Sequence, residues 1–356
     1  MKRTLILMSA LLAVASCGFA QSLNKSEAKA LQNFLSQPAY NGGTNGAQLG
    51  LQANNIAMLP GVKVAGGHVT EIEWKGKNLS GNLNLSNFPA LQKVDVSGNK
   101  IVNLTLANNP ALVDVNAGRN RITDIDITNC PQVQVLRLNH NRLAQMELGQ
   151  VPMLKKLNIA VNQFEALDVS DATGLESLNC MSNRLQGLDV SGCQALKNLY
   201  AGYNDLTQLE LSGLVSLQYL NVNGNKIMKL YLQNLPALSA LNCSDNHMTD
   251  LVLNNCKAIN DIWAPYNDLT NFQVGDAQQL AFVNVEWNDL TTLNLSGLTF
   301  LQRVNAANNQ LLTVNVSNDP MLTTINLTNN DMLNDLQCEM CPMLRNVYGY
   351  NEWDML

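Results

Sequence analysis

Aromatic and charged side chains are scarce in this chain of 356 residues. Aromatic residues make up 5% of the sequence and charged residues 14%, whereas hydrophobic residues reach 46%. So little charge beside so much apolar surface excludes an intrinsically disordered chain. The formal net charge of -6 also argues against nucleic acid, or an anionic membrane surface, as the main partner.

Residues that commonly carry catalysis or bind metals are equally few. The three histidines are His68, His140 and His247, and none has a second ligand at metal-binding spacing. The metalloprotease, P-loop and dinucleotide-binding motifs do not occur in their required contexts. We therefore expect no catalytic residue, no metal site and no cofactor, and we interpret the chain as a binding protein and not an enzyme.

Long hydrophobic runs are missing after the first twenty residues. Lys2 and Arg3 precede an apolar stretch at 5–15, which is too short to span a bilayer and has the form of a signal peptide over 1–20. Two processing routes stay open. Residues 18–20 form a signal-peptidase site, whereas 14–17 resemble a lipobox that would lipidate Cys17 and supply the only membrane attachment. We expect an exported protein that is secreted or lies at the cell surface or outer membrane.

The dominant feature of the sequence is an asparagine that returns every 21 residues. Counted from this asparagine, apolar residues recur at offsets of +2, +5, +13, +16 and +18. Such a period is the signature of a stacked repeat architecture. The repeating residues are Asn99, Asn120, Asn141, Asn162, Asn183, Asn204, Asn225, Asn246, Asn267, Asn288, Asn309 and Asn330.

Each repeat predicts one short strand over offsets +13 to +18, because its last apolar residues alternate with period two. A single unit of this kind cannot bury its apolar face, so stacked repeats must pair their strands in a parallel sheet and share one core. The asparagine falls where the chain leaves the strand. Its amide can satisfy backbone groups that the turn would otherwise bury unpaired, which predicts a structural ladder.

The repeat matches the pattern L-x-x-L-x-L-x-x-N-x-L, for example at 175–185, and L-D-V-S segments return at 167–170 and 188–191. Over roughly residues 70–350 it resembles the leucine-rich repeats of bacterial internalin-type surface proteins. This resemblance implies a mostly β, α/β-type curved solenoid with a parallel sheet on its concave face and a short helical N-terminal cap. It also implies adhesion or host recognition.

The two ends of the array are atypical, as caps of a solenoid should be. We expect an N-terminal cap over 21–76, repeats over 77–335, and an irregular last repeat with a C-terminal cap over 336–356. Within the first cap, 24–36 predicts a helix that Asn24 can cap. Glu27 follows three residues later, as in a capping box.

Eight cysteines in an exported chain raise the question of disulfides. Those that recur at every third repeat would lie about 14 Å apart, too far to bond, and two of them fall in an apolar column. The recurring residues are Cys130, Cys193 and Cys256, and, in the apolar column, Cys180 and Cys243. Cys338 and Cys341 are close enough for a disulfide, with free thiols and then metal binding as the alternatives.

Side chains at offsets +15, +17 and +19 should point away from the core, and there the few aromatics gather. Exposed aromatics group at interfaces because they bury large areas at low entropic cost, although they also pack on each other across strands. The aromatics, at these offsets or just before the asparagine, are Tyr200, Tyr203, Tyr219, Trp263, Tyr266, Phe282 and Trp287; Asp245, Asp261 and Glu286 lie among them.

Three functions fit this pattern. We favour binding of another macromolecule, most simply a protein, on the concave face. A glycan is the alternative, because aromatic rings stack on sugars while neighbouring carboxylates and amides take the hydroxyl groups. A scaffold of the cell envelope without external ligand is the third, and it would show the aromatics stacked flat on one another.

Overall fold

The computed structural model describes residues 23–51 and 59–350. The chain divides into two compact units, the first ending at Leu175 and the second beginning at Glu176, and each is described by itself. The predicted signal peptide and Cys17 lie outside the described residues. Within the described ranges, no helix has the length and apolar character needed to cross a membrane.

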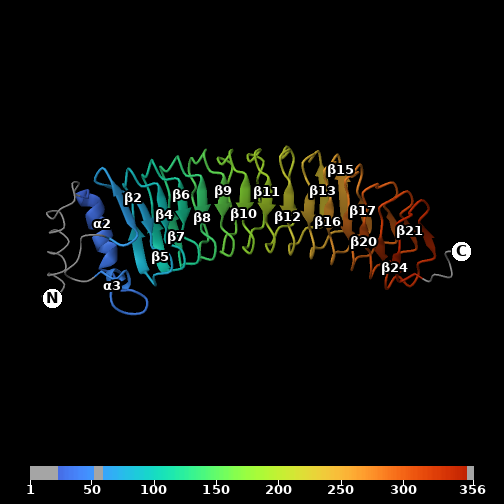
Figure 1. Ribbon diagram of the computed structural model, residues 1–356, viewed down its shortest axis with the longest axis horizontal. Helices are drawn as coiled ribbons and strands as arrows, with labels where there is room; N and C mark the ends of the chain where they lie inside the picture. The colour runs from blue at the N-terminus through green and yellow to red at the C-terminus, as the bar shows by residue number, and fades with distance from the viewer. Residues whose placement is uncertain (1–22, 52–58, 351–356) are drawn as a thin grey trace. The chain divides into compact units, whose positions relative to one another are not determined.

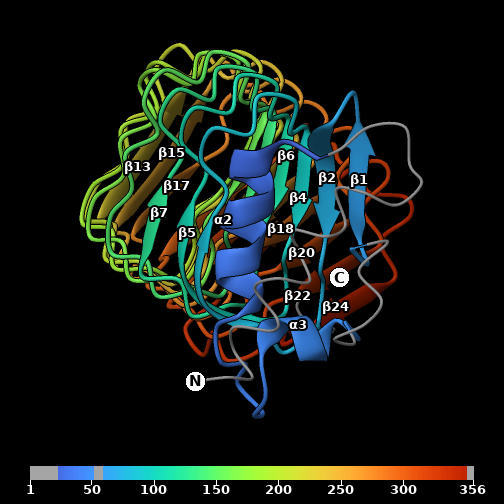
Figure 2. The ribbon, with the colours of Figure 1, turned by 90° about the vertical axis from the view of Figure 1, so that its left-hand side faces the viewer.

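The first unit begins with helix α2 (Lys25–Leu35), as the sequence predicts. The Asn24 side chain caps it by accepting hydrogen bonds from the backbone N–H groups of Ser26 and Glu27. A short helix α3 (Asn45–Gln48) follows. Helix α2 buries Leu31, Phe34 and Leu35 and lies across the end of this unit (Figure 2).

The expected capping box does not form, because Glu27 is used elsewhere. Its side chain is buried, and its carboxylate accepts a 2.8 Å hydrogen bond from the backbone N–H of Val69. The other oxygen lies 2.7 Å from Nδ1 of His68. Glu27 therefore fastens the helix to strand β2 (His68–Glu73) of the cap instead of closing the helix end.

A parallel sheet forms one side of each unit, with one three-residue strand per coil in its regular part (Figure 1). We call its two portions the long sheet. In the first unit, β1 pairs antiparallel with β2, and the remaining strands follow in parallel. These are β1 (Val62–Ala65), β2 (His68–Glu73), β4 (Lys93–Asp95), β6 (Asp114–Asn116), β8 (Val135–Arg137) and β9 (Lys156–Asn158).

In the second unit every strand of the long sheet pairs in parallel with the strand of the next coil. The register advances by one repeat at each step, and a one-residue slip places Asn346 opposite Thr324. The strands are β10 (Ser177–Asn179), β11 (Asn198–Tyr200), β12 (Tyr219–Asn221), β14 (Ala240–Asn242), β16 (Asp261–Trp263), β18 (Phe282–Asn284), β20 (Arg303–Asn305), β22 (Thr324–Asn326) and β24 (Asn346–Tyr348).

In each coil a return segment leads from the ladder asparagine to the next strand of the long sheet. The prediction of one strand per repeat is wrong for several coils, because their return segments form a second strand. Coils stack at strand spacing on both sides, so neighbouring return segments pair wherever both are extended. They form three sheets of three strands. These contain β3 (Ser80–Asn84), β5 (Lys100–Thr105) and β7 (Asp124–Asp126); β13 (Lys229–Gln233), β15 (Asp250–Asn254) and β17 (Asn271–Gln273); and β19 (Thr292–Asn294), β21 (Thr313–Asn315) and β23 (Asp335–Gln337).

The repeating asparagines join each coil to the one before it. In a representative coil, Oδ1 of Asn225 accepts a 3.0 Å hydrogen bond from the backbone N–H of Leu206. Its Nδ2 donates to the carbonyls of Ala201 at 3.1 Å and Val222 at 2.9 Å. The side chain is 6% exposed, so one amide satisfies three backbone groups that lack access to water.

The seven cysteines of the described residues are free thiols in this structure, Cys338 and Cys341 among them. Cys341 points its thiol at the carbonyl of Val316, 2.9 Å away, and not at Cys338. Cys130 makes the equivalent contact with Leu106 in the first unit, so the last coil repeats an arrangement found earlier in the chain. Cys180 and Cys243 are fully buried in the core, and burial raises the pKa of Cys180 to about 12.

Candidate binding surface

All seven aromatics singled out in the sequence lie in the second unit, and we call them together the aromatic strip. Four of them flank the buried central residue of a strand of the long sheet, so their side chains leave the core. The other three immediately precede a ladder asparagine. The four strand residues are Tyr200, Tyr219, Trp263 and Phe282, and the three turn residues are Tyr203, Tyr266 and Trp287.

The rings pack in pairs across neighbouring coils. The centroids of Trp263 and Phe282 lie 4.6 Å apart with the planes tilted by 38°. Tyr200 and Tyr219 form a similar pair at 5.0 Å and 37°. Such pairs contribute roughly 0.5–1.5 kcal/mol beyond the area they bury. Packing between coils therefore accounts for part of the strip.

Pairing leaves much of the strip in solvent. Tyr266 and Trp287 stack at 6.1 Å with an interplanar angle of 13°, yet they remain 55% and 52% exposed. Tyr203 is 54% exposed and Trp263 44% exposed. The second unit thus presents a group of aromatic surfaces on one side of its long sheet, which is typical of an interface.

The three turn residues of the strip have a left-handed backbone. Their φ angles are 54° at Tyr203, 57° at Tyr266 and 54° at Trp287. Elsewhere in the same column the chain has glycine or asparagine, the residues that tolerate this conformation best, at positions such as Gly224 and Asn308, and other residues, such as Arg119 and Val161, at the rest. A bulky aromatic here costs on the order of 1 kcal/mol. The sequence alone did not reveal this strain, because glycine or asparagine occupies only four of the twelve positions of the column.

Three acidic side chains lie within the strip without a basic partner. Across the described ranges no lysine, arginine or histidine nitrogen comes within 4.0 Å of a carboxylate oxygen of Asp245, Asp261 or Glu286. Burial beside the neighbouring side chains raises the pKa of the Asp261 carboxyl above its usual value. The strip therefore carries uncompensated negative charge.

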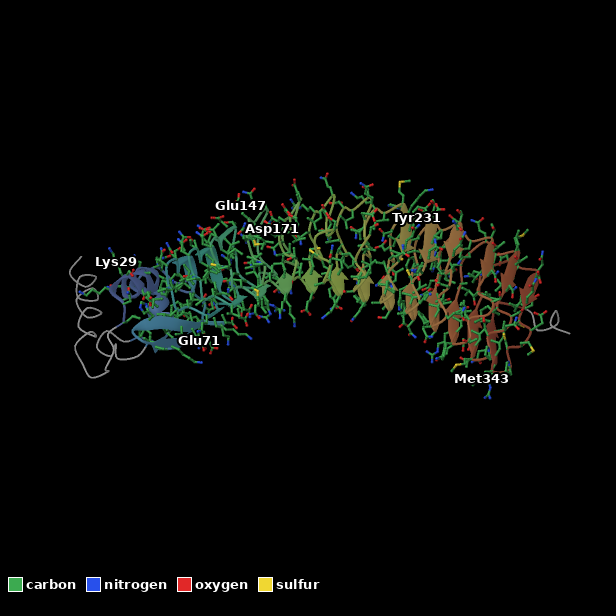
Figure 3. The ribbon with its side chains drawn as sticks, turned by 90° about the horizontal axis from the view of Figure 1, so that it is seen from above. Lys29, Glu71, Glu147, Asp171, Tyr231 and Met343 are labelled. Carbon is green, nitrogen blue, oxygen red and sulfur yellow. The ribbon has the colours of Figure 1, made fainter. Side chains whose placement is uncertain are left out.

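Exposed side chains elsewhere differ in arrangement. Tyr231 is 52% exposed, but it lies on β13 in a return-side sheet and outside the strip (Figure 3). No group of three or more histidine, cysteine, aspartate or glutamate side chains in 23–51 and 59–350 is placed to hold a metal ion.

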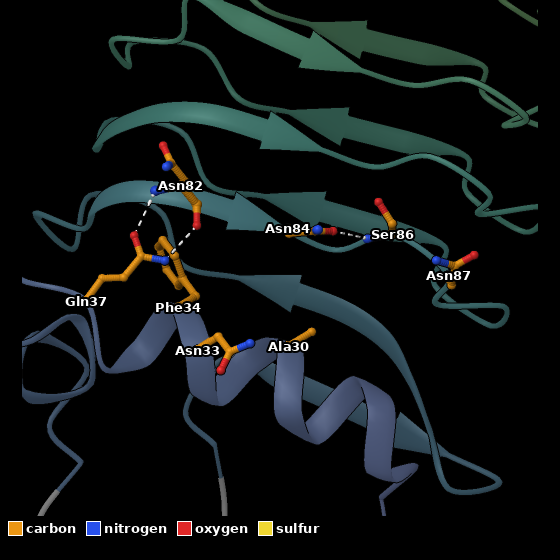
Figure 4. Close-up of a pocket in the computed structure, with 8 residues that line it drawn as sticks. All are labelled: Ala30, Asn33, Phe34, Gln37, Asn82, Asn84, Ser86 and Asn87. Atoms are coloured by element: carbon orange, nitrogen blue, oxygen red, sulfur yellow. Dashed lines mark hydrogen bonds between the residues drawn. The ribbon is translucent and has the colours of Figure 1, made fainter. Parts of the chain in front are cut away.

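A shallow hollow in the first unit has a structural explanation. It lies between α2 and the return segment that begins with β3 (Figure 4). There the Gln37 amide accepts from the backbone N–H of Asn82 and donates to its carbonyl, both at 2.8 Å. Gln37 thus completes the hydrogen bonding of an edge strand. The lining residues are Ala30, Asn33, Phe34, Gln37, Asn82, Asn84, Ser86 and Asn87.

The repeat geometry and the asparagine ladder define a leucine-rich-repeat solenoid. No protein-family model and no curated protein matches the chain. Among solved structures it is similar to the functional domain of InlJ from Listeria monocytogenes, with 23% identity and a TM-score of 0.60 over 93% of this chain and 64% of that one. The chain thus spans less than two thirds of that relative.

Two other solved structures support the same fold. An internalin, InlF, from Listeria monocytogenes has 20% identity and a TM-score of 0.54, covering 82% of this chain and 92% of its own. A leucine-rich-repeat protein from Leptospira interrogans has 19% identity and a TM-score of 0.50, covering 92% and 99%. The similarity to internalins is therefore one of fold.

The InlJ structure is described as including a cysteine ladder, which invites a comparison. In the present chain the cysteines of one column recur only at every third coil, as with Cys130 and Cys193. Coils between them carry Val151 and Ala172 at the same position. The cysteines of this column therefore do not form a continuous ladder, because two coils without cysteine separate each from the next.

Proposed function

We propose that this chain is an exported surface protein that binds another protein through the aromatic strip. The observation that carries the proposal is the exposure of Tyr203, Tyr266 and Trp287 in a left-handed backbone conformation. Fold stability favours glycine or asparagine at these positions. A benefit outside the fold, namely contact with a partner, accounts for large aromatic residues there.

A protein partner fits the width of the strip better than a sugar does. The strip extends over several coils from β11 to β18 and combines rings with separate carboxylates. A glycan site needs only two or three rings with open faces. The most parallel pair, Tyr266 and Trp287, turns one face of each ring toward the other, which removes these faces from a sugar.

The test uses residues 21–356 as the bait against purified candidate surface proteins and a glycan array in parallel. The combined variant Tyr200→Ala, Trp263→Ala and Trp287→Ala should weaken binding of a protein partner by about a hundredfold or more, since aromatic hot spots each contribute about 2 kcal/mol or more. The matched control is Tyr231→Ala, which removes an equally exposed ring from outside the strip. Unchanged binding by the combined variant would refute the proposal, and a glycan hit would replace it.

Export is tested on the mature protein. We expect the chain to appear outside the cytoplasm with its N-terminus at Gln21 or, if lipidated, at Cys17. N-terminal sequencing and mass spectrometry separate these two outcomes, because a lipidated Cys17 carries a large additional mass. Retention of Met1 on the cellular protein contradicts export.

A further inference from the structure

We propose that the aromatic strip receives a basic side chain, arginine or lysine, of its protein partner above Ala240, between Tyr219 and Trp263 and against Asp261. This inference rests on the proposed function and names the chemistry that the strip selects. It makes one coil of the second unit the centre of recognition.

Strand register defines the place. Tyr219, Ala240 and Asp261 lie opposite one another on β12, β14 and β16. Two residues further along the same strands, Trp263 lies opposite Asn242. Strands are about 4.8 Å apart, so Tyr219 and Asp261 are separated by roughly 10 Å of backbone, with only the Ala240 methyl group between them. Tyr219 packs on Tyr200 of β11 and Trp263 packs on Phe282 of β18, so neither ring has its packing partner on β14, and one side chain of a partner can enter above Ala240.

The charge of the surroundings selects a cation. Asp261 has no basic neighbour within 4.0 Å, and Asp245 lies in the same coil as Ala240 and is exposed. The basic side chains of the adjoining coils are already engaged. Lys226 bonds Asp205 at 2.7 Å, and His247 lies 3.7 Å from Asp268. An incoming cation is therefore the group that can neutralise Asp261.

The rings favour the same occupant. Tyrosine and tryptophan faces attract cations within about 6 Å of the ring centroid, and tryptophan does so best. Arginine adds a planar surface that stacks on a ring while its N–H groups bond a carboxylate. An acidic group would face Asp245 and Asp261 with the same charge. A neutral group would leave the partly buried Asp261 carboxylate without a partner.

The experiment follows the indole N–H signal of Trp263 in the ¹⁵N-labelled chain while a peptide is added. The probe is acetyl-Gly-Ser-Arg-Ser-Gly-amide, and its control has citrulline, a neutral isostere, in place of arginine. We expect the arginine peptide to shift the Trp263 signal with millimolar affinity and the citrulline peptide to bind about tenfold more weakly. Salt should weaken the arginine peptide only, because the contact is charged.

Two variants locate the contact. Asp261→Asn keeps the shape of the side chain and should weaken the arginine peptide about fivefold or more. Asp331→Asn removes an exposed carboxylate from another part of the unit and should leave the affinity unchanged. Both side chains lie outside the core, and matched thermal unfolding curves verify that each variant is folded.

The failures of the two proposals are distinguishable. Equal binding of the arginine and citrulline peptides, or no shift of Trp263 at about 20 mM peptide, would overturn the cation site. The cation site is also overturned if the variants Asp261→Asn and Asp261→Lys bind an identified protein partner as tightly as the unchanged chain does. In that case the proposed function stands provided the triple aromatic variant loses that partner. A triple variant that keeps the partner overturns both proposals.

Discussion

At the scale of single residues, the column before each ladder asparagine combines a fixed backbone with variable side chains. The left-handed conformation recurs from coil to coil, with φ of 58° at Arg119, 57° at Val161 and 63° at Gly224. Glycine and asparagine adopt it with little strain, whereas a β-branched residue is disfavoured most. Backbone preference therefore does not explain which residue type occupies each position of this column.

Val161 offers a direct measure of this strain, because it is β-branched, 40% exposed and outside the aromatic strip. We expect Val161→Asn to raise the free energy of unfolding by about 1 kcal/mol, since asparagine tolerates the left-handed region. Val215→Asn is the matched control, because Val215 is 54% exposed and has no left-handed backbone. Chemical denaturation measures both, and an equal effect in the two variants would contradict the explanation by strain.

Asp319 occupies a position built for an amide. It is fully buried, and its Oδ1 accepts a 2.7 Å hydrogen bond from the backbone N–H of Leu298. Asn109, at the same repeat position in the first unit, accepts equivalently and also donates Nδ2 to the carbonyls of Leu85 and Leu106. Oδ2 of Asp319 has no hydrogen-bond partner, and burial raises the pKa of this carboxyl to about 7.

The raised pKa fixes the sign of a pH effect. Because the folded state holds the proton of Asp319 more tightly than the unfolded state, the contribution of this group to stability is complete below about pH 4 and is lost as the pH rises toward 7. Two titratable groups in this part of the unit are Cys341, which interacts electrostatically with Asp319 and points its thiol at the carbonyl of Val316, and Glu339, which accepts a hydrogen bond from Ser317.

We expect Asp319→Asn to raise stability at pH 8 by on the order of 2 kcal/mol, because the amide donates where the carboxylate cannot. The gain should shrink toward pH 4, where Asp319 is protonated in the unchanged chain. Thermal unfolding across this pH range measures the difference between the two chains, and Asp331→Asn, an exposed carboxyl, is the control. A gain that does not vary with pH would contradict the protonation of Asp319.

At the scale of the elements, the asparagine ladder is what allows very short strands to make a stable sheet. Each strand of the regular coils contributes only three residues, so the turn after it must supply further hydrogen bonds between coils. The ladder amides supply them while remaining shielded from water, as Asn225 and Asn246 are at 6% exposure. Loss of one amide leaves several buried backbone groups unpaired at once.

Asn225→Ala tests the ladder in the second unit. The change leaves the N–H of Leu206 and the carbonyls of Ala201 and Val222 without this partner, and we expect a loss of about 3 kcal/mol or more. Gln218→Ala removes an exposed amide from the preceding strand region and should change stability by less than about 0.5 kcal/mol. Similar losses in both variants, measured by urea denaturation, would show that the ladder is not the cause.

The elements differ in how far the sequence predicts them. The strands of the long sheet, the buried columns and helix α2 follow from local pattern alone, because the period repeats and Asn24 begins an apolar stripe. The bonds of Glu27 to His68 and Val69 join residues far apart in the chain, so no local pattern reveals them. Return strands such as β13 and β15 form only where the extended return segments of two neighbouring coils pair, so the pattern within one repeat does not predict them.

The same distinction applies to the candidate site. Alternation along the strands predicts that Tyr219 and Trp263 leave the core, and they do. The pairing of Trp263 with Phe282 and the left-handed backbone of Trp287 depend on how neighbouring coils meet, and these emerge only from the coordinates. Whether the strip binds a partner is decided by neither and stays a proposal.

At the scale of the whole molecule, the two units present different chemistry on their long sheets. In the first unit two pairs of opposite charges on neighbouring strands form ion pairs: Arg137 bonds Asp114 at 2.8 Å and Lys93 bonds Glu73 at 2.7 Å. The second unit instead presents the aromatic strip, with acidic groups that have no basic neighbour. Packing between coils accounts for part of this difference, and the proposed function accounts for the exposed rings and the unpaired carboxylates.

Binding should therefore depend on the second unit alone. We expect Lys93→Ala together with Arg137→Ala to leave the affinity for a protein partner within about twofold, and stability within about 1 kcal/mol, because both ion pairs are partly exposed. Trp263→Ala with Tyr266→Ala should weaken the same partner about tenfold or more. Isothermal titration calorimetry measures both. A larger loss from the first pair of substitutions would place the contact on the first unit, and it would leave the strained aromatics of the second unit without the partner that accounts for them.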